Sequence, residues 1–148
     1  MILPILSRPD RRLRLKCEDV GAVDDDILAL MRDMLETMYD APGIGLAAIQ
    51  VGVPKCVIVL DLTNETEERH PLCMANPKIT WRSPVIRSIE EGCLSVPNKF
   101  KAVSRSTKVR VSYLDERNKP QELEADGLLA TCLQHEIDHL DGILFIDL

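Results

Sequence analysis

Apolar residues recur at every third or fourth position after three consecutive aspartates, Asp24 to Asp26. This is the spacing of one face of an α-helix, and its members are Ile27, Leu30, Met31, Met34, Leu35 and Met38. The aspartates can cap this helix and complement its dipole, and residues 41–43, Ala-Pro-Gly, end it. A methionine stripe could also line a ligand groove. We predict core packing instead, because Met fills irregular gaps between other side chains.

The middle of the chain is typical of β-strands. Residues 57–62 form a short, mainly apolar run, and residues 108–113 alternate basic or polar side chains with apolar ones. A last short strand is predicted over residues 143–146. Residues that favour turns interrupt this pattern, and they are Asn64, Asn76-Pro77, Ser83-Pro84, Pro97-Asn98 and Asn118-Lys119-Pro120.

A second helix is predicted from about Gly127 to Leu140, where Asp141-Gly142 ends it. The order of helix, several strands and helix indicates an α+β fold with antiparallel or mixed sheets. We expect these sheets to pack around the last helix at the centre of the fold. No repeat, low-complexity tract or linker divides the 148 residues, so we predict one catalytic domain over residues 1–148.

The composition narrows the classes of function. The net charge is −6 with no basic stripe, so direct nucleic-acid binding is not expected. No apolar run approaches the ~18 residues of a membrane span, and the charges of the first segment follow its apolar residues, unlike those of a signal peptide. Five cysteines without CxxC spacing do not suggest a disulfide framework. We therefore expect a cytoplasmic protein with reduced thiols.

The second predicted helix carries the strongest chemical signal. Residues 135–139 read His-Glu-Ile-Asp-His, the HExxH pattern. Its two imidazoles lie about 40° apart around a helix, so both can reach one metal ion. Glu136 can then approach a water at that ion as general base. The alternative is a helix with two surface or core histidines. The third histidine, His70, lies in a polar segment and is assigned no role.

A catalytic metal site needs three protein ligands and an open position. Zinc proteases with HExxH often take their third ligand from further along the chain, but residues 140–148 offer only two aspartates and the terminal carboxylate. An upstream thiolate is the natural candidate. We favour Cys93 over Cys132, because three ligands strung along one helix would strain a tetrahedron. Cys132 is then a small buried residue near the site.

Three separate segments together resemble the peptide deformylase family. They read Gly-Ile-Gly-Leu-Ala-Ala-Ile-Gln over residues 43–50, Glu-Gly-Cys-Leu-Ser over 91–95, and Gln-His-Glu-Ile-Asp-His-Leu over 134–140. The order is that of the three signature motifs of the family. The resemblance implies a metal-dependent hydrolase that removes the formyl group from the N-terminal methionine of nascent polypeptides and releases formate. Its partners would be formyl-methionyl nascent peptides.

The resemblance also implies a metal and a set of ligands. Cys93, His135 and His139 would hold one divalent ion, and Glu136 would take a proton from water and deliver it to the departing amine. The implied ion is iron(II) in the cell, with nickel, cobalt or zinc also able to occupy the site. The chemistry of the residues alone would name zinc as readily.

Further residues follow from the resemblance. Gln50 and the backbone N–H of Leu94 would stabilise the oxyanion that forms during hydrolysis. Asp138 would pair with Arg105 beside the metal ligands. The alternative for this last pair is two unrelated surface charges.

The methionine side chain of the substrate would enter an apolar pocket near the metal. The backbone of residues 44 and 45 would pair with the substrate in an extended conformation. This segment does not fit a phosphate loop, because no Lys-Ser/Thr follows its glycines. The candidate substrate-binding residues are Ile44, Gly45, Ile89, Glu91, Gly92, Leu128, Thr131 and Cys132.

Two features depart from the family pattern. Many bacterial members continue past the final strand with a C-terminal helix implicated in ribosome docking, whereas this sequence stops at Leu148, which puts ribosome association in question. Residues 98–100 read Asn-Lys-Phe, where many members carry Gly or an Arg used in peptide binding. We therefore expect substrate affinity to differ.

Two other classes of function are compatible with HExxH. Another metal hydrolase, such as an endopeptidase, is disfavoured because no further ligand follows the motif. A non-catalytic module with a structural metal would need a closed site with four protein ligands.

Overall fold

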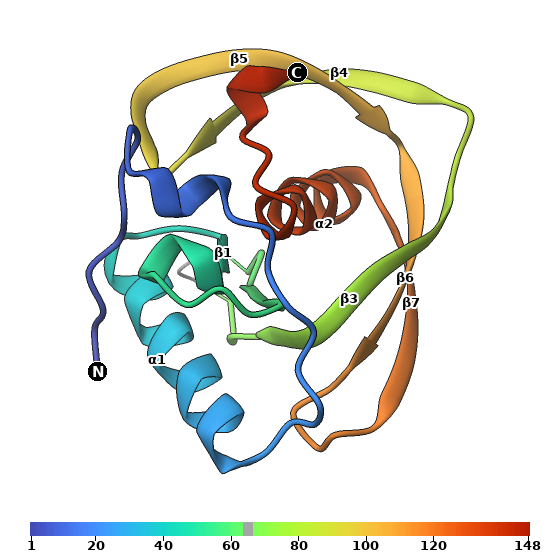
Figure 1. The fold of residues 1–148 in the computed structure, drawn as a ribbon. Helices are drawn as coiled ribbons and strands as arrows, with labels where there is room; N and C mark the ends of the chain where they lie inside the picture. Colours follow the sequence, from blue (N-terminus) through green and yellow to red (C-terminus); the bar gives the residue numbers. More distant parts are fainter. Residues whose placement is uncertain (64–66) are drawn as a thin grey trace.

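The computed structural model describes residues 1–63 and 67–148, so the turn predicted at Asn64 lies outside the described residues. Its helices are α1 (Asp25–Asp40) and α2 (Gly127–Leu140), with short 3-10 helices η1 (Arg11–Arg14), η2 (Ala48–Val51) and η3 (Phe145–Asp147). The strands are β1 (Gly45–Ala47), β2 (Val57–Leu60), β3 (Leu72–Arg82), β4 (Ile86–Cys93), β5 (Val96–Ser106), β6 (Lys108–Leu114) and β7 (Pro120–Asp126). Figure 1 shows their arrangement.

The strands form two separate sheets. The larger sheet has the order β1-β2-β3-β6-β7, and the smaller consists of β4 and β5. Neighbouring strands in both sheets run antiparallel. The predicted α+β class with antiparallel sheets is therefore confirmed. β1 lies at one edge of the larger sheet, and this edge faces the site described below.

Helix α1 packs on one face of the larger sheet. Its N-terminus is capped by Asp24, whose side chain accepts a hydrogen bond from the Ile27 N–H at 2.9 Å. The predicted methionine stripe is buried against the sheet, with Met34 and Met38 fully inaccessible. The prediction of core packing for these methionines is thus confirmed.

Strand β2 is buried on both faces, which explains its uninterrupted apolar sequence. Val57 and Val59 belong to the core cluster that includes α1, whereas Ile58 and Leu60 belong to the cluster that includes α2. The two helices therefore cover opposite faces of this part of the sheet.

Helix α2 spans Gly127–Leu140 and contacts strands of both sheets. In Figure 1 it lies between β4 and β5 on one side and β1 and β3 on another. Most of its residues are buried, which brings polar side chains of residues 134–139 into the interior. A smaller cluster, formed by Val96, Val103, Leu144 and Phe145, joins the smaller sheet to η3.

The prediction of a final strand over residues 143–146 is wrong. Residues 145–147 form η3, and Leu144 and Phe145 are both buried, each 1% exposed. A strand would place these neighbours on opposite faces, whereas a 3-10 turn lets both enter the small cluster.

Two of the predicted turns lie inside long strands. Asn76 (φ 50°) sits in β3 where the pairing with β6 shifts register, and Asn98 (φ 63°) sits in β5 where the pairing with β4 shifts. Asn tolerates this left-handed conformation, so each residue makes an irregularity in a strand instead of ending it. The turns at Ser83-Pro84 and at 118–120 do separate strands.

Among the described residues, neither helix combines the length and the apolar character needed to cross a bilayer.

Candidate metal centre and substrate pocket

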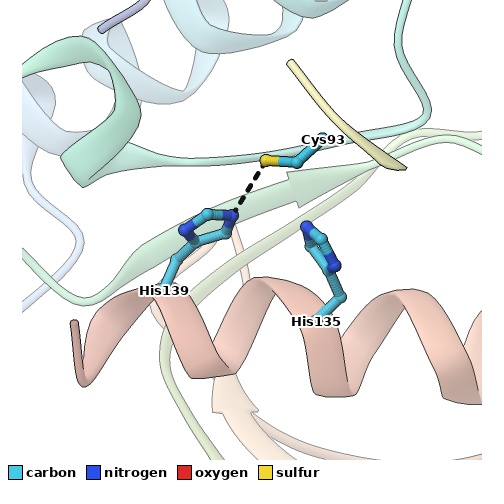
Figure 2. Close-up of side chains that lie close together, drawn as sticks. All are labelled: Cys93, His135 and His139. Carbon is cyan, nitrogen blue, oxygen red and sulfur yellow. Dashed lines mark hydrogen bonds between the residues drawn. The ribbon is translucent and has the colours of Figure 1, made fainter. Parts of the chain in front are cut away.

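Three potential metal ligands from distant parts of the chain converge above α2. The ligand atoms of Cys93, His135 and His139 all lie within 4.8 Å of one another, and Cys93 Sγ is 3.4 Å from His139 Nε2. Figure 2 shows both rings rising from one face of the helix toward the sulfur. The histidines are one turn apart on α2, and the cysteine ends β4. This is the juxtaposition that the sequence predicted for these residues.

The three residues fit a divalent metal in their chemistry. A thiol and two imidazoles are the donors that borderline metals such as zinc and iron(II) prefer. A ligand imidazole must be neutral, and burial together with the nearby positive charge of His135 lowers the pKa of His139 to about 3. Its Nδ1 has no hydrogen-bond partner among the described residues.

The surroundings of His135 favour positive charge. Burial lowers its pKa, but Cys93, Glu136 and Glu91 raise it, and the pKa lies at about 10. A metal cation would take the place of a ring proton here, and the carboxylates of Glu91 and Glu136 would attract it. The ring also stacks on Phe145, with centroids 6.0 Å apart. Phe145, at the position where some zinc proteases carry a third histidine, thus packs against a ligand candidate.

Glu91 orients His135. Its Oε1 lies 2.9 Å from His135 Nδ1, and Arg105 donates two hydrogen bonds to the same carboxylate, from Nε at 2.5 Å and from Nη2 at 2.9 Å. Burial would raise the pKa of Glu91, but these hydrogen bonds outweigh burial and lower it. An ionised carboxylate accepts from Nδ1–H, which leaves Nε2 of the ring available to a metal.

The predicted contact between Arg105 and Asp138 is present. Arg105 Nη1 donates to Asp138 Oδ2 at 2.8 Å, and the guanidinium is almost completely buried. Arg105 therefore bridges Glu91 on β4 and Asp138 on α2. This bridge ties the smaller sheet to the helix that carries both histidines.

Glu136 lies inside the pocket with one oxygen unpaired. Burial raises its pKa to about 7, and the positive charge of His135 opposes this rise. Its Oε1 has no hydrogen-bond partner among the described residues. The carboxylate passes close to Gly45, where a Cβ would lie 2.5 Å from Glu136 Oε2. Gly45 is thus the residue type that leaves room for this carboxylate.

Gln50 and Leu94 approach the cluster from the two different sheets. Gln50 lies in η2, immediately after β1, and its Nε2 is 3.6 Å from Cys93 Sγ. Leu94 lies in the turn between β4 and β5, and its backbone N–H makes no hydrogen bond within the described chain. The Gln50 amide therefore lies beside a ligand atom, and Leu94, next to Cys93 in the chain, lines the adjoining cavity.

A cavity of about 430 Å³ opens next to the cluster. Its rim includes the exposed side chains of Ile44, Leu128 and Phe100. Phe100 packs on Gly92, where a Cβ would lie 2.8 Å from its Cε1. All the predicted substrate-binding residues line the cavity, namely Ile44, Gly45, Ile89, Glu91, Gly92, Leu128, Thr131 and Cys132.

Cys132 lies near the ligand cluster but outside it. Burial, reinforced by the charge of Glu136, raises the pKa of its thiol to about 12. Such a thiol stays protonated, and the thiolate is the metal-binding form. The three groups that converge are Cys93, His135 and His139.

Two features of the site were not predicted. The sequence predicts Glu91 only as a residue of the pocket wall, but its carboxylate also hydrogen-bonds His135 and Arg105. Its position two residues before Cys93 could have indicated this, because side chains two apart share a strand face. Ser95 was assigned no role, although its Oγ accepts a hydrogen bond from Gln50 Nε2 at 3.0 Å. Its place at the end of the 91–95 segment that resembles a family signature was the available signal.

Comparison with known proteins gives a consistent result. The family model described as polypeptide deformylase matches residues 2–148. A peptide deformylase of Methylocella silvestris is 57% identical over 147 residues, which cover 97% of this chain and 75% of that protein.

Solved structures agree with the sequence relatives. A peptide deformylase from Ehrlichia chaffeensis has a TM-score of 0.94 at 42% identity, covering 99% of this chain and 87% of that one. A peptide deformylase from Synechococcus elongatus, solved in complex with actinonin, has a TM-score of 0.92 at 48% identity, covering 98% and 77%.

Proposed function

This chain belongs to the polypeptide deformylase family, the enzymes that remove the N-formyl group from nascent polypeptides, and we propose that Cys93, His135 and His139 hold the metal for that reaction. The observation that carries this assignment is the convergence of their ligand atoms within 4.8 Å beside the cavity. The proposed ion in the cell is iron(II), and nickel, cobalt or zinc would suit the same donors.

When bound, a divalent metal supplies a nucleophilic water near neutral pH and Lewis acidity toward the formyl oxygen. Glu136 is the proposed general base. Its unpaired Oε1 takes a proton from the attacking water and later delivers it to the nitrogen of the departing amine. A pKa raised by burial to about 7 suits both transfers.

Gln50 and Leu94 are the proposed oxyanion donors. As the formyl carbon becomes tetrahedral, negative charge develops on its oxygen, and preorganised N–H groups stabilise it. The Gln50 amide lies 3.6 Å from Cys93 Sγ, and Leu94 follows Cys93 in the chain; neither donor carries a charge that would compete with the metal.

The substrate peptide is proposed to add to the free edge of β1. β1 ends the larger sheet, so its outer edge at Gly45 can pair with an extended chain, and Ile44, whose carbonyl accepts the Asp61 N–H, continues this edge. The methionine side chain would enter the cavity, whose proposed walls include Glu91, Gly92, Leu128 and Cys132.

Glu91, Arg105 and Asp138 form the proposed support of the ligands. Glu91 sets the ring orientation of His135, and Arg105 holds Glu91 to α2 through Asp138. We assign residues 1–148 to one catalytic domain built around α2 and its HExxH residues. The five free cysteines fit a cytoplasmic location, in which thiols stay reduced.

The test combines metal analysis with an assay on the same anaerobic sample. We expect about one metal per chain, and release of formate from a formyl-Met peptide. The matched control is the same peptide without the formyl group, which should not be cleaved. Background activity with iron, nickel and cobalt loaded in turn would reject the proposal.

A second measurement addresses the open coordination position. The Synechococcus elongatus relative was solved with actinonin, and we propose that actinonin binds this chain as well. Binding should require the loaded metal and disappear after chelation. A closed structural site, with four protein ligands, would not show this dependence.

A further inference from the structure

The side-chain amide of Gln50 is held at both ends. Its Oε1 accepts a hydrogen bond from the Ala47 N–H at 2.9 Å, and its Nε2 donates to Ser95 Oγ at 3.0 Å. Gln50 is 1% exposed and Ser95 0%, so bulk solvent does not compete for these groups.

These two bonds decide where the remaining hydrogen points. Acceptance at Oε1 fixes which end of the amide carries the NH2 group, and Ser95 takes one of its two hydrogens. The second hydrogen is thereby directed toward the metal ligands, and in this structure Nε2 donates it to Cys93 Sγ at 3.6 Å. Without the Ser95 hydroxyl, the Nε2 end would lose the partner that fixes its rotation.

We propose that Ser95 is a positioning residue, which holds the Gln50 amide in the orientation that donates to the oxyanion. This inference rests on the oxyanion role proposed above for Gln50. Ser95 itself acts through Gln50 and does not touch the reacting atoms.

The N-terminal segment braces the same pair. The Leu6 N–H donates to the Gln50 backbone O at 2.7 Å, and the Arg8 N–H donates to the Ser95 backbone O at 2.8 Å. Gln50 follows the larger sheet and Ser95 belongs to the turn of the smaller one, and among the described residues no strand ladder joins the two sheets. Residues 6–8 therefore fix the spacing between the Gln50 amide and the neighbouring Leu94 N–H.

The kinetic test is a double-mutant cycle on the nickel-loaded enzyme. Ser95→Ala should lower kcat for a formyl-Met peptide by about 10- to 100-fold, as expected for a displaced donor, with KM changed less than about twofold. In a Gln50→Ala background the same substitution should change kcat by less than about twofold. An equal loss in both backgrounds, or a loss carried by KM, would overturn the proposal.

The brace is tested with proline, which removes one N–H donor. Leu6→Pro deletes the bond to Gln50 and should lower kcat. Ile5→Pro is the matched control, because the Ile5 N–H donates no hydrogen bond to any described residue. Thermal unfolding should first show that both variants are folded. Equal kcat in the two would then show that the bond from Leu6 does not position Gln50.

A spectroscopic readout is independent of activity. In the zinc-loaded protein, the two side-chain NH2 protons of Gln50 should give separate, slowly exchanging NMR signals. Ser95→Ala should shift them and accelerate exchange about tenfold or more. Unchanged signals would refute the positioning role. If the wild type releases no formate, the proposed function fails. The NMR shift caused by Ser95→Ala would still test the contact between Gln50 and Ser95.

Discussion

Glu91 Oε1 lies 2.9 Å from His135 Nδ1, which joins a β4 carboxylate to an α2 imidazole across the boundary between the two sheets. The same carboxylate receives two hydrogen bonds from the buried Arg105. The ring orientation of His135 is therefore set before a metal arrives.

The first prediction follows from this contact. Glu91→Gln removes the charge and replaces one acceptor oxygen with an NH2 group. Whichever way the amide is turned, its NH2 faces a donor of Arg105 or His135, so the His135 tautomer is no longer fixed and we expect metal affinity to fall about 10- to 100-fold. The measurement is competition with a chromophoric chelator. Glu90→Gln, a substitution at the exposed neighbour, is the control and should retain wild-type affinity. Equal affinity in the two variants would contradict the orienting role.

The second prediction separates proton transfer from metal binding. Glu136→Gln keeps the size of the side chain and removes the proton acceptor, so kcat should fall by about 10²–10⁴-fold. Metal content should remain about one per chain. A variant that retains the wild-type rate would exclude Glu136 as general base.

The third prediction concerns the space beside Glu136. Gly45→Ala places a methyl group 2.5 Å from Glu136 Oε2, so the carboxylate must move. We expect kcat to drop about 10-fold or more, as for other small displacements of a reacting group. Gly21→Ala is the control, since a Cβ there meets nothing within 4 Å. If both alanine variants keep full activity, the space that Gly45 leaves for Glu136 is not needed for catalysis.

The fourth prediction distinguishes the five thiols. Burial is the first cause that raises the pKa of Cys17 and Cys73 to about 11 and of Cys56 and Cys132 to about 12, so at pH 8 these thiols should react slowly with iodoacetamide.

Cys93 borders the cavity, and we expect it to be alkylated first in the metal-free protein and protected in the loaded one. Peptide mass spectrometry gives the site and the rate. Labelling of Cys93 at equal rates with and without metal would argue against its role as a ligand.

The sequence was most informative where one local pattern carries the chemistry. The spacing of His135 and His139 places both rings on one helix face, and the apolar period of residues 27–38 identifies the face of α1 that is buried. Cys93 is favoured over Cys132 because three ligands strung along one helix would strain a tetrahedral site. These inferences needed only helix geometry and donor chemistry.

Contacts between distant segments could not be predicted from residue spacing and donor chemistry. The bond from Gln50 to Ser95 depends on how the smaller sheet docks, and no residue spacing encodes that. Similarly, a strand and a 3-10 turn are equally compatible with the short apolar stretch near Phe145, and the small cluster beneath β5 decides between them. The pair Asn76-Pro77 predicts a turn, but in the structure Asn76 takes its left-handed conformation within β3, where the pairing with β6 shifts register.

In the part of the chain that the structure describes, no strand ladder joins the two sheets, and this has a thermodynamic consequence. Among the described residues, the β4–β5 hairpin is held to the rest of the fold largely by side chains, namely the Arg105–Asp138 bridge and the cluster with Phe145, together with the backbone bond from Arg8 to Ser95. A metal shared by Cys93 on this hairpin and the two histidines on α2 would cross-link the hairpin to the helix. Removal of the metal by a chelator should then loosen the β4–β5 hairpin more than the rest of the fold. Metal binding and docking of this hairpin onto α2 are therefore coupled.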